Sequence, residues 1–423
     1  MTSLNSDPAL HNDSSQKQQK QPHSNLFTQL LRKVFLILIT LILTLVFLLY
    51  IFVVLNIPQL VFLVALHTLG RLDSRIALKI KQLNIGLIGF GFYWFVFLLE
   101  VFADVELEFS GDFIEPGENA LMMSNHLSNV DFLILTAIAY RKGMLSFLKY
   151  LAKKDLLYIP FLGFPAMLLG GQIILNRNWQ QDQQHLQESV NSVLKDDIPC
   201  YITLFPEGTR LSEKNLKSSI QFSKERQLRE LSKVVYPRVK GLRMILQAIK
   251  NQKASSKHTK GVKWVYDVTL GYPPTRQFIK AYEQHGSSSS RAIHTTHTTS
   301  TATHTHTTTT GTTTTHTQQQ QRVFPVLPFA DLLMKNLSGL KICVNIKKID
   351  IDCIPVDDEK QFTEWCYERF YRKEDMLIEL EKNALELLKQ HSHRNISQSE
   401  LSACYSFKNE KILDEPFRFT PWW

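Results

Sequence analysis

The sequence has few cysteines, and their spacing suggests neither a disulfide framework nor a zinc site. Five cysteines occur in 423 residues, and no two are separated as C-x-x-C. This argues against the disulfide-rich secreted class and the zinc-finger class, so we expect no metal site. Signatures of RNA or DNA binding are also missing, although the formal net charge is +9. We therefore expect no nucleic-acid partner.

Charged residues are absent from long stretches of the N-terminal quarter. Residues 34–55 form an apolar run that, as a helix, would be about 33 Å long, enough to cross the hydrocarbon core of a membrane. Asn56-Ile57-Pro58 predicts a break, a second apolar stretch covers 60–69, and a third covers 85–102. Between the last two, residues 71–81 form a basic patch suited to lipid headgroups. We predict membrane-embedded helices over 26–103 in an integral membrane protein, and a basic surplus directed at anionic lipid.

The remainder of the chain predicts an α/β fold in which helices flank a mixed sheet. Polar tails are expected at 1–25 and 394–423, and a catalytic domain at 104–285. A strand and a helix in 322–393 are expected to complete that domain as a C-terminal extension. The expected strands are Val105–Phe109, Ala120–Met123, Gly171–Leu175, Cys200–Phe205, Val265–Leu270 and Leu340–Cys353, and the expected helices are Asp131–Tyr140, Asp182–Leu194 and Asp358–His391.

Residues 286–321 are a low-complexity segment dominated by threonine. Five histidines lie in it: His294, His297, His304, His306 and His316. One interpretation is a metal-binding tract. The scarcity of apolar residues favours the other, a disordered insertion that carries no part of the function.

The first chemical motif is Asn125-His126-Leu127-Ser128-Asn129-Val130-Asp131, which follows an expected strand and opens an expected helix. Asp131, about one helical turn away, can hold one imidazole nitrogen of His126 and leave the other free as a base. The start of the helix also offers backbone amides for a developing oxyanion. A hydrogen-bonded histidine near a helix cap is the alternative interpretation of this pair alone.

The second motif is Phe205-Pro206-Glu207-Gly208-Thr209-Arg210, at the end of the expected strand 200–205. Ligand sites of open α/β sheets lie at that end of the strands. Gly208 permits a sharp turn, and Arg210 can bind a phosphate through two hydrogen bonds. A structural Glu–Arg ion pair would explain this motif alone, but not its occurrence together with the first.

Both motifs resemble the N-H-x4-D and F-P-E-G-T-R motifs of the glycerophospholipid acyltransferases, which include the lysophosphatidate acyltransferases. Residues 171–177 (GQIILNR) resemble that family's G-x-I-x-x-x-R block, and Tyr236-Pro237-Arg238 stands where its fourth block belongs. The segments ILNRNWQQD, VVYPRVKGL, VYDVTLGYP and FTEWCYERFYRKEDML resemble the lysocardiolipin and lysophosphatidylinositol branch. Val239-Lys240 and the insertion at 286–321 depart from the family pattern.

The resemblance implies an enzyme that transfers an acyl chain from acyl-CoA, as co-substrate and without a further cofactor, to the free hydroxyl of an anionic lysophospholipid. It implies an endoplasmic-reticulum membrane protein. Lysophosphatidate is the alternative acceptor, and an inactive membrane scaffold is the alternative of a different class. His126 and Asp131 would be catalytic, and the implied substrate-binding residues are Asn125, Arg177, Glu207, Gly208, Thr209 and Arg210.

Overall fold

The computed structural model describes residues 26–50, 53, 57–69, 73–158, 172–175, 179–195, 199–255, 261–272, 340–390 and 406–407. Arg177 and the segments 1–25 and 286–321, which carried predictions, lie outside the described residues. The chain divides into two compact units, Met1–Phe47 and Leu48–Trp423.

Helix α1 (Leu26–Tyr50) contains the described part of the first unit. The apolar run from residue 34 is helical as predicted up to Tyr50. Many of its apolar side chains are exposed, among them Phe35, Leu41 and Leu45, which are 61–68% accessible. Such a surface is unfavourable in water and suits a hydrocarbon environment.

The second unit is built on a seven-stranded mixed sheet in the order β1-β7-β6-β2-β5-β3-β4. All neighbouring pairs are parallel except β6 with β7, which are antiparallel. The predicted mixed sheet is therefore confirmed. Its strands are β1 (Val105–Gly111), β2 (Ala120–Ser124), β3 (Leu148–Lys153), β4 (Ile173–Leu175), β5 (Tyr201–Leu204), β6 (Trp264–Gly271) and β7 (Leu340–Asp350).

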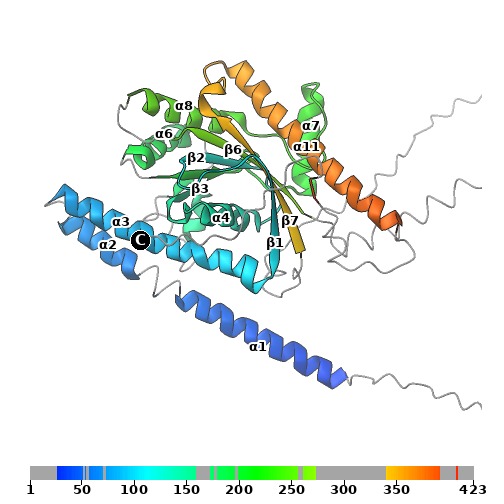
Figure 1. Ribbon diagram of the computed structural model, residues 1–423, viewed down its shortest axis with the longest axis horizontal. Helices are drawn as coiled ribbons and strands as arrows, with labels where there is room; N and C mark the ends of the chain where they lie inside the picture. The colour runs from blue at the N-terminus through cyan, green and yellow to red at the C-terminus, as the bar shows by residue number, and fades with distance from the viewer. Residues whose placement is uncertain are drawn as a thin grey trace, which may run out of the picture. The chain divides into compact units, whose positions relative to one another are not determined.

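Helices cover both faces of this sheet, as Figure 1 shows. One face carries α3 (Ser74–Val96) and α4 (Asp131–Arg141), and the other carries α6 (Trp179–Lys195), α8 (Val239–Ser255) and α11 (Glu359–Gln390). Each face has its own cluster of buried apolar side chains. α7 (Glu213–Glu225) begins at Ser212, whose side chain accepts a hydrogen bond from the Asn215 amide.

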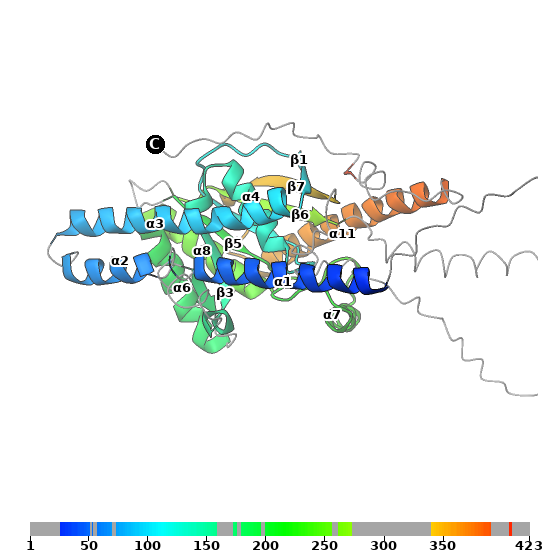
Figure 2. The same cartoon turned by 90° about the horizontal axis from the view of Figure 1, so that it is seen from below.

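Helices α2 (Ile57–Thr68) and α3 lie side by side in the second unit (Figure 2). α3 starts at Asp73, whose carboxylate accepts the amide of Arg75, and it continues through a π-helical turn, Phe97–Phe102. The basic patch from Ser74 onward and the third apolar stretch are therefore continuous. No glycine or proline stands at 82–84 to end the helix, so both belong to one element.

The C-terminal half of α3 packs closely against the segment around Ser146 and the end of α4. Gly89 packs so tightly against Ser146 that a Cβ atom on it would lie 1.8 Å from the Ser146 hydroxyl oxygen. Glu100 in the π-helical turn binds both terminal nitrogens of Arg141 at the end of α4, at 2.7 and 2.9 Å. Both side chains are largely buried. This part of the apolar helix is thus packed against protein.

Candidate active site

The two predicted motifs meet at one edge of the sheet. β2 and β5 are parallel neighbours, so the loops that follow Ser124 and Leu204 leave the sheet at the same edge. The first loop carries residues 125–130 and leads into α4 at Asp131, and the second carries 205–212 and leads into α7. The sheet order therefore brings together two segments that are 80 residues apart.

His126 and Asp131 form the hydrogen-bonded pair that the first motif predicted. The distance from His126 Nδ1 to Asp131 Oδ2 is 2.7 Å, and the two side chains are 20% and 0% exposed. Because Nδ1 faces the carboxylate, the other ring nitrogen, Nε2, is the one available to act as a base. The imidazole also stacks on the ring of Phe205, at 4.1 Å between centroids and a 15° interplanar angle. Together these contacts fix the orientation of the ring.

The amides at the start of α4 are directed at Asp131. Its Oδ2 atom accepts the amides of Leu127 and Ser128 at 2.7 and 2.9 Å, in addition to His126. The amide of His126 donates to Glu207. These three amides, which precede the first residue of α4, are therefore occupied within the protein.

The second motif holds the backbone of His126 from both sides. Its amide donates to Glu207 Oε2 at 3.0 Å, and its carbonyl accepts the amide of Leu211 at 2.8 Å. Glu207 is 1% exposed. Burial, with the nearby charge of Asp131, raises the pKa of Glu207 well above its usual value. We predicted a substrate contact for Glu207, and in this structure its buried carboxyl group supports the backbone of His126 through Oε2.

Asn125 and Thr209 also have internal roles where we predicted substrate binding. The Asn125 side chain is fully buried and bonds both backbone groups of Leu270 in β6, donating to the carbonyl at 3.0 Å and accepting the amide at 2.8 Å. The Thr209 hydroxyl accepts the side-chain amide of Asn215 at 2.7 Å. These contacts stabilise the loops in which Asn125 and Thr209 lie.

Arg210 and Gly208 are exposed, and they lie in the loop that holds the backbone of the His126–Asp131 dyad. The carbonyl of Arg210 is held by Asn215 at 2.8 Å, and its guanidinium makes no hydrogen bond to the described residues. Gly208 has φ of +65°, a conformation that favours glycine. The side chain of Arg238 lies across it, with Cδ 3.0 Å from where a Cβ atom would stand. Arg238 is exposed too, so two guanidinium groups border the site.

Sequence reasoning gave no role to Tyr272, which belongs to the same site. Tyr272 follows β6, the other parallel neighbour of β2, and its hydroxyl donates to Asp131 Oδ1 at 2.5 Å. The residue is buried, and burial raises its pKa well above the usual value, so the phenol keeps its proton. The residue lies in the segment VYDVTLGYP, whose resemblance to the family assigned no role to a single side chain, so its contact with Asp131 became visible only with the strand order.

The helix α11 contacts strand β6 and the loop 232–234, both of which lie next to the site. Lys373 is 1% exposed and pairs with Asp267 of β6 at 2.5 Å. The carboxylate of the next residue, Glu374, accepts the amides of residues 232–234 at 2.7–3.2 Å. That loop leads to Arg238, whose amide donates to the Pro206 carbonyl at 2.7 Å. The second motif is thus supported by residues near the end of the chain.

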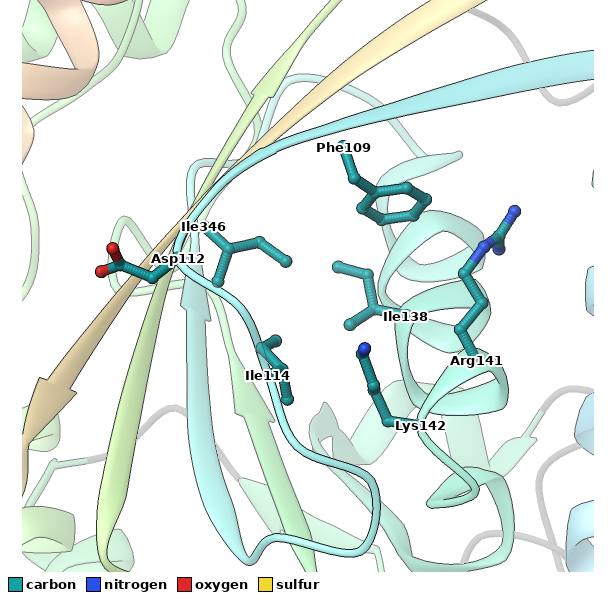
Figure 3. A pocket seen from close by; sticks show the side chains of 7 residues that line it. All are labelled: Phe109, Asp112, Ile114, Ile138, Arg141, Lys142 and Ile346. Carbon is teal, nitrogen blue, oxygen red and sulfur yellow. The ribbon is translucent and has the colours of Figure 1, made fainter. Parts of the chain in front are cut away.

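A small cavity lies at the opposite end of α4 and contains none of the predicted site residues (Figure 3). Its lining is mostly apolar, with Arg141 and Lys142 on the helix side, and Asp112 points away from the other side chains. Among the residues described here, no group of histidine, cysteine and acidic side chains is arranged to hold a metal ion. The chemical groups of the candidate site are therefore those around His126.

Comparison with known families agrees with this geometry. Residues 106–253 match the family model described as Acyltransferase, and residues 333–402 match Acyltransferase C-terminus. The first match contains His126, Asp131, Glu207 and Arg210, and the second contains β7 and α11. The chain belongs to the glycerophospholipid acyltransferase family.

Named relatives in this acyltransferase family have different acceptors. The chain is 32% identical over 176 residues to a probable 1-acyl-sn-glycerol-3-phosphate acyltransferase 5 of Arabidopsis thaliana, covering 42% of this chain and 44% of the relative. It is 29% identical over 178 residues to lysocardiolipin acyltransferase 1 of Mus musculus (42% and 45%), and 31% over 186 residues to lysophosphatidylinositol acyltransferase 10 of Caenorhabditis elegans (43% and 46%). The chain spans less than half the length of each of these three relatives.

A solved structure is also similar to this acyltransferase-family chain. It is the 1-acyl-sn-glycerophosphate acyltransferase PlsC of Thermotoga maritima, at 15% identity and a TM-score of 0.36, covering 78% of this chain and 93% of that chain.

Proposed function

We propose that the protein is an acyl-CoA-dependent lysophospholipid acyltransferase. The observation that carries the proposal is the His126–Asp131 pair, which buried groups hold in one orientation. It lies at the sheet edge that also carries the exposed Arg210 and Arg238. A scaffold that kept only the fold would have no need of a partly exposed imidazole held in one orientation by a buried carboxylate. The pair therefore favours catalysis over the scaffold alternative.

In the proposed reaction, His126 Nε2 removes the proton from the free glycerol hydroxyl of the lysophospholipid. The oxygen attacks the thioester carbonyl, an ester C–O bond forms, and the C–S bond to CoA breaks. The proton held by His126 passes to the departing thiolate. Asp131 stabilises the imidazolium formed in between. Base assistance of this kind contributes about 10²–10⁴-fold in rate.

We propose an anionic lysophospholipid of the lysophosphatidylinositol or lysocardiolipin type as the acceptor. Support comes from the exposed guanidinium groups of Arg210 and Arg238 and from the names of two relatives. Lysophosphatidate is the second candidate, because another relative is named for 1-acyl-sn-glycerol-3-phosphate. Membranes containing the protein should be assayed with acyl-CoA and each of these three acceptors, measuring released CoA thiol and the acylated product. An absence of transfer to all three acceptors would contradict the proposal.

Arg210→Ala is expected to raise the KM for the lysophospholipid about tenfold or more, because a charge-assisted contact to its phosphate is lost. The KM for acyl-CoA should change far less. Lys214→Ala is the matched control, since Lys214 is an exposed cation on the neighbouring helix α7. Initial rates measured with each substrate varied in turn give both constants. Equal increases in the two KM values would mean that Arg210 does not select the acceptor.

We also propose that the catalytic unit lies on the cytosolic face of the endoplasmic reticulum. Arg32 and Lys33 before the first apolar run favour a cytosolic N-terminus. Among the described residues, one helix, Arg75–Phe102, is long and apolar enough to cross a membrane, but a third of its apolar window is buried in the protein. The part that precedes the contacts of Gly89 with Ser146 and of Glu100 with Arg141, Arg75–Leu87, is only about 20 Å long as a helix, shorter than a hydrocarbon core. We therefore propose that residues 34–69 enter the bilayer and return, with α3 lying in one leaflet.

An epitope inserted in residues 286–321 is expected to be digested when protease is added to sealed microsomes, because a cytosolic catalytic unit leaves that segment outside. Detergent-permeabilised microsomes provide the control for epitope cleavage. Protection of the epitope until detergent is added would contradict this topology. So would an N-glycan at Asn336 or Asn395, the two sequons after the catalytic motifs.

A further inference from the structure

We propose that Tyr272 is a positioning residue that completes a three-membered relay, Tyr272–Asp131–His126. The inference rests on the proposed function. Tyr272 lies outside both residue ranges matched by the family models. Its hydroxyl donates to Asp131 Oδ1 at 2.5 Å, while Asp131 Oδ2 faces His126 Nδ1 at 2.7 Å. One carboxylate thus has a phenol on one oxygen and the catalytic imidazole on the other.

The contacts of Asp131 explain why this phenol would matter. Two backbone amides and His126 converge on Oδ2. Tyr272 is the hydrogen-bond donor found on Oδ1 among the described residues. Without it, the carboxylate could turn about its Cβ–Cγ bond and lose alignment with the imidazole. The phenol therefore locks the rotation of the group that orients the base.

The phenol also withdraws negative charge from the carboxylate. A carboxylate that accepts a strong hydrogen bond on one oxygen attracts an imidazolium on the other oxygen less strongly. His126 must be neutral to accept the substrate proton, so loss of the phenol should strengthen the attraction of Asp131 for the protonated, inactive imidazole. The other ionisable groups around the pair are Glu207 after β5, the Lys373–Asp267 pair of α11 and β6, and the exposed guanidinium groups of Arg210 and Arg238. The test below changes none of them.

The test replaces Tyr272 with phenylalanine, which keeps the buried ring and removes the hydroxyl. The expected kcat is about 10- to 100-fold lower, with the KM for both substrates within about twofold of wild type. The acidic limb of the pH–rate profile should move to higher pH by about half a unit to one unit.

Tyr266→Phe is the matched control. Tyr266 is a buried tyrosine on β6 whose hydroxyl also donates to a carboxylate, Glu118, at 2.6 Å. This variant removes the same kind of bond from strand β6, which directly precedes Tyr272, but the bond lies away from the His126–Asp131 pair. Its pH profile should therefore be that of wild type.

A second measurement does not depend on acyl transfer. Diethyl pyrocarbonate modifies neutral imidazole, so mass spectrometry of the His126 peptide across pH reports when that ring is neutral. In Tyr272→Phe the midpoint of modification should move upward by the same amount as the kinetic limb. An inactive wild-type protein would overturn the proposed function, yet this titration would still test the relay.

Three results would overturn the relay. The first is unchanged activity and titration in Tyr272→Phe. The second is a loss of activity with neither pH curve displaced, which indicates a structural role alone. The third is failure of Tyr272→Phe to reach the membrane when Tyr266→Phe does, since a purely structural hydroxyl predicts that result.

Discussion

Replacing His126 with alanine is expected to lower the rate of acyl transfer about 10³- to 10⁴-fold, because it removes the group proposed to accept the hydroxyl proton. The backbone bonds of residue 126 to Glu207 and Leu211 do not depend on the side chain, so the variant should fold. The measurement is the initial rate of lysophospholipid acylation per unit of protein in washed membranes.

His67→Ala is the control for the loss of a histidine. His67 is exposed in the last turn of α2 and has no part in the proposed chemistry. It should retain the wild-type rate. Activity of His126→Ala within a few-fold of wild type would refute the proposed base.

The second large effect is expected for Asp131→Asn, whose rate should fall about 10²- to 10⁴-fold. Asparagine has nearly the same shape but carries no charge to stabilise the imidazolium. Its NH2 group must also face either the Tyr272 hydroxyl or the donors around Oδ2. Because the shape of the side chain is kept, the variant should still reach the membrane. Because the base itself remains and only its orientation and charge stabilisation are lost, mainly kcat should fall.

Two comparisons sharpen this prediction. Asp352→Asn removes an exposed carboxylate that pairs with Lys253, and should leave the rate unchanged. The double variant with His126→Ala should be no slower than His126→Ala alone, because residues that act as a unit are not additive. A further loss in the double variant would show that Asp131 acts independently of the histidine.

Local patterns were sufficient to predict the parts of the site that lie next to each other in sequence. His126 and Asp131 are five residues apart on a strand-to-helix turn, so their pairing follows from spacing alone. The meeting of the two motifs required only that both strands be parallel, which the alternation of strands and helices indicates. The expected strand ends were correct within a few residues for β1, β2, β5 and β6.

The roles of individual polar groups could not be predicted in this way. Asn125, Glu207 and Thr209 stand within motifs, yet their partners are Leu270, the His126 amide and Asn215, and finding those partners required the sheet order. Strand β3 was missed because it contains the buried Lys149, whose pKa burial lowers to about 8. Lysine is rarely buried, so its presence made a buried strand read as exposed chain.

The missed helix α8 had a usable signal. Leu242, Ile245, Leu246 and Ile249 are all buried and recur at the three- and four-residue spacing of one helix face. For Lys373 no such signal exists, because its partner Asp267 lies in another region of the sequence. Long-range pairs of this kind need the topology before they can be recognised.

Strand β7 lies between β1 and β6, so the sheet can form completely only after β7 has been synthesised. β1 begins at residue 105 and pairs with a strand that begins at residue 340, so the two are made far apart in time. At about 5–20 residues per second, roughly 10–50 s separate their synthesis. Throughout that interval β1 lacks its sheet partner. Once β6 (Trp264–Gly271) has been made, one of its edges also remains open to pairing with other chains until β7 follows. The sheet therefore cannot be completed before β7 has been made, and until then its unpaired strands can pair wrongly.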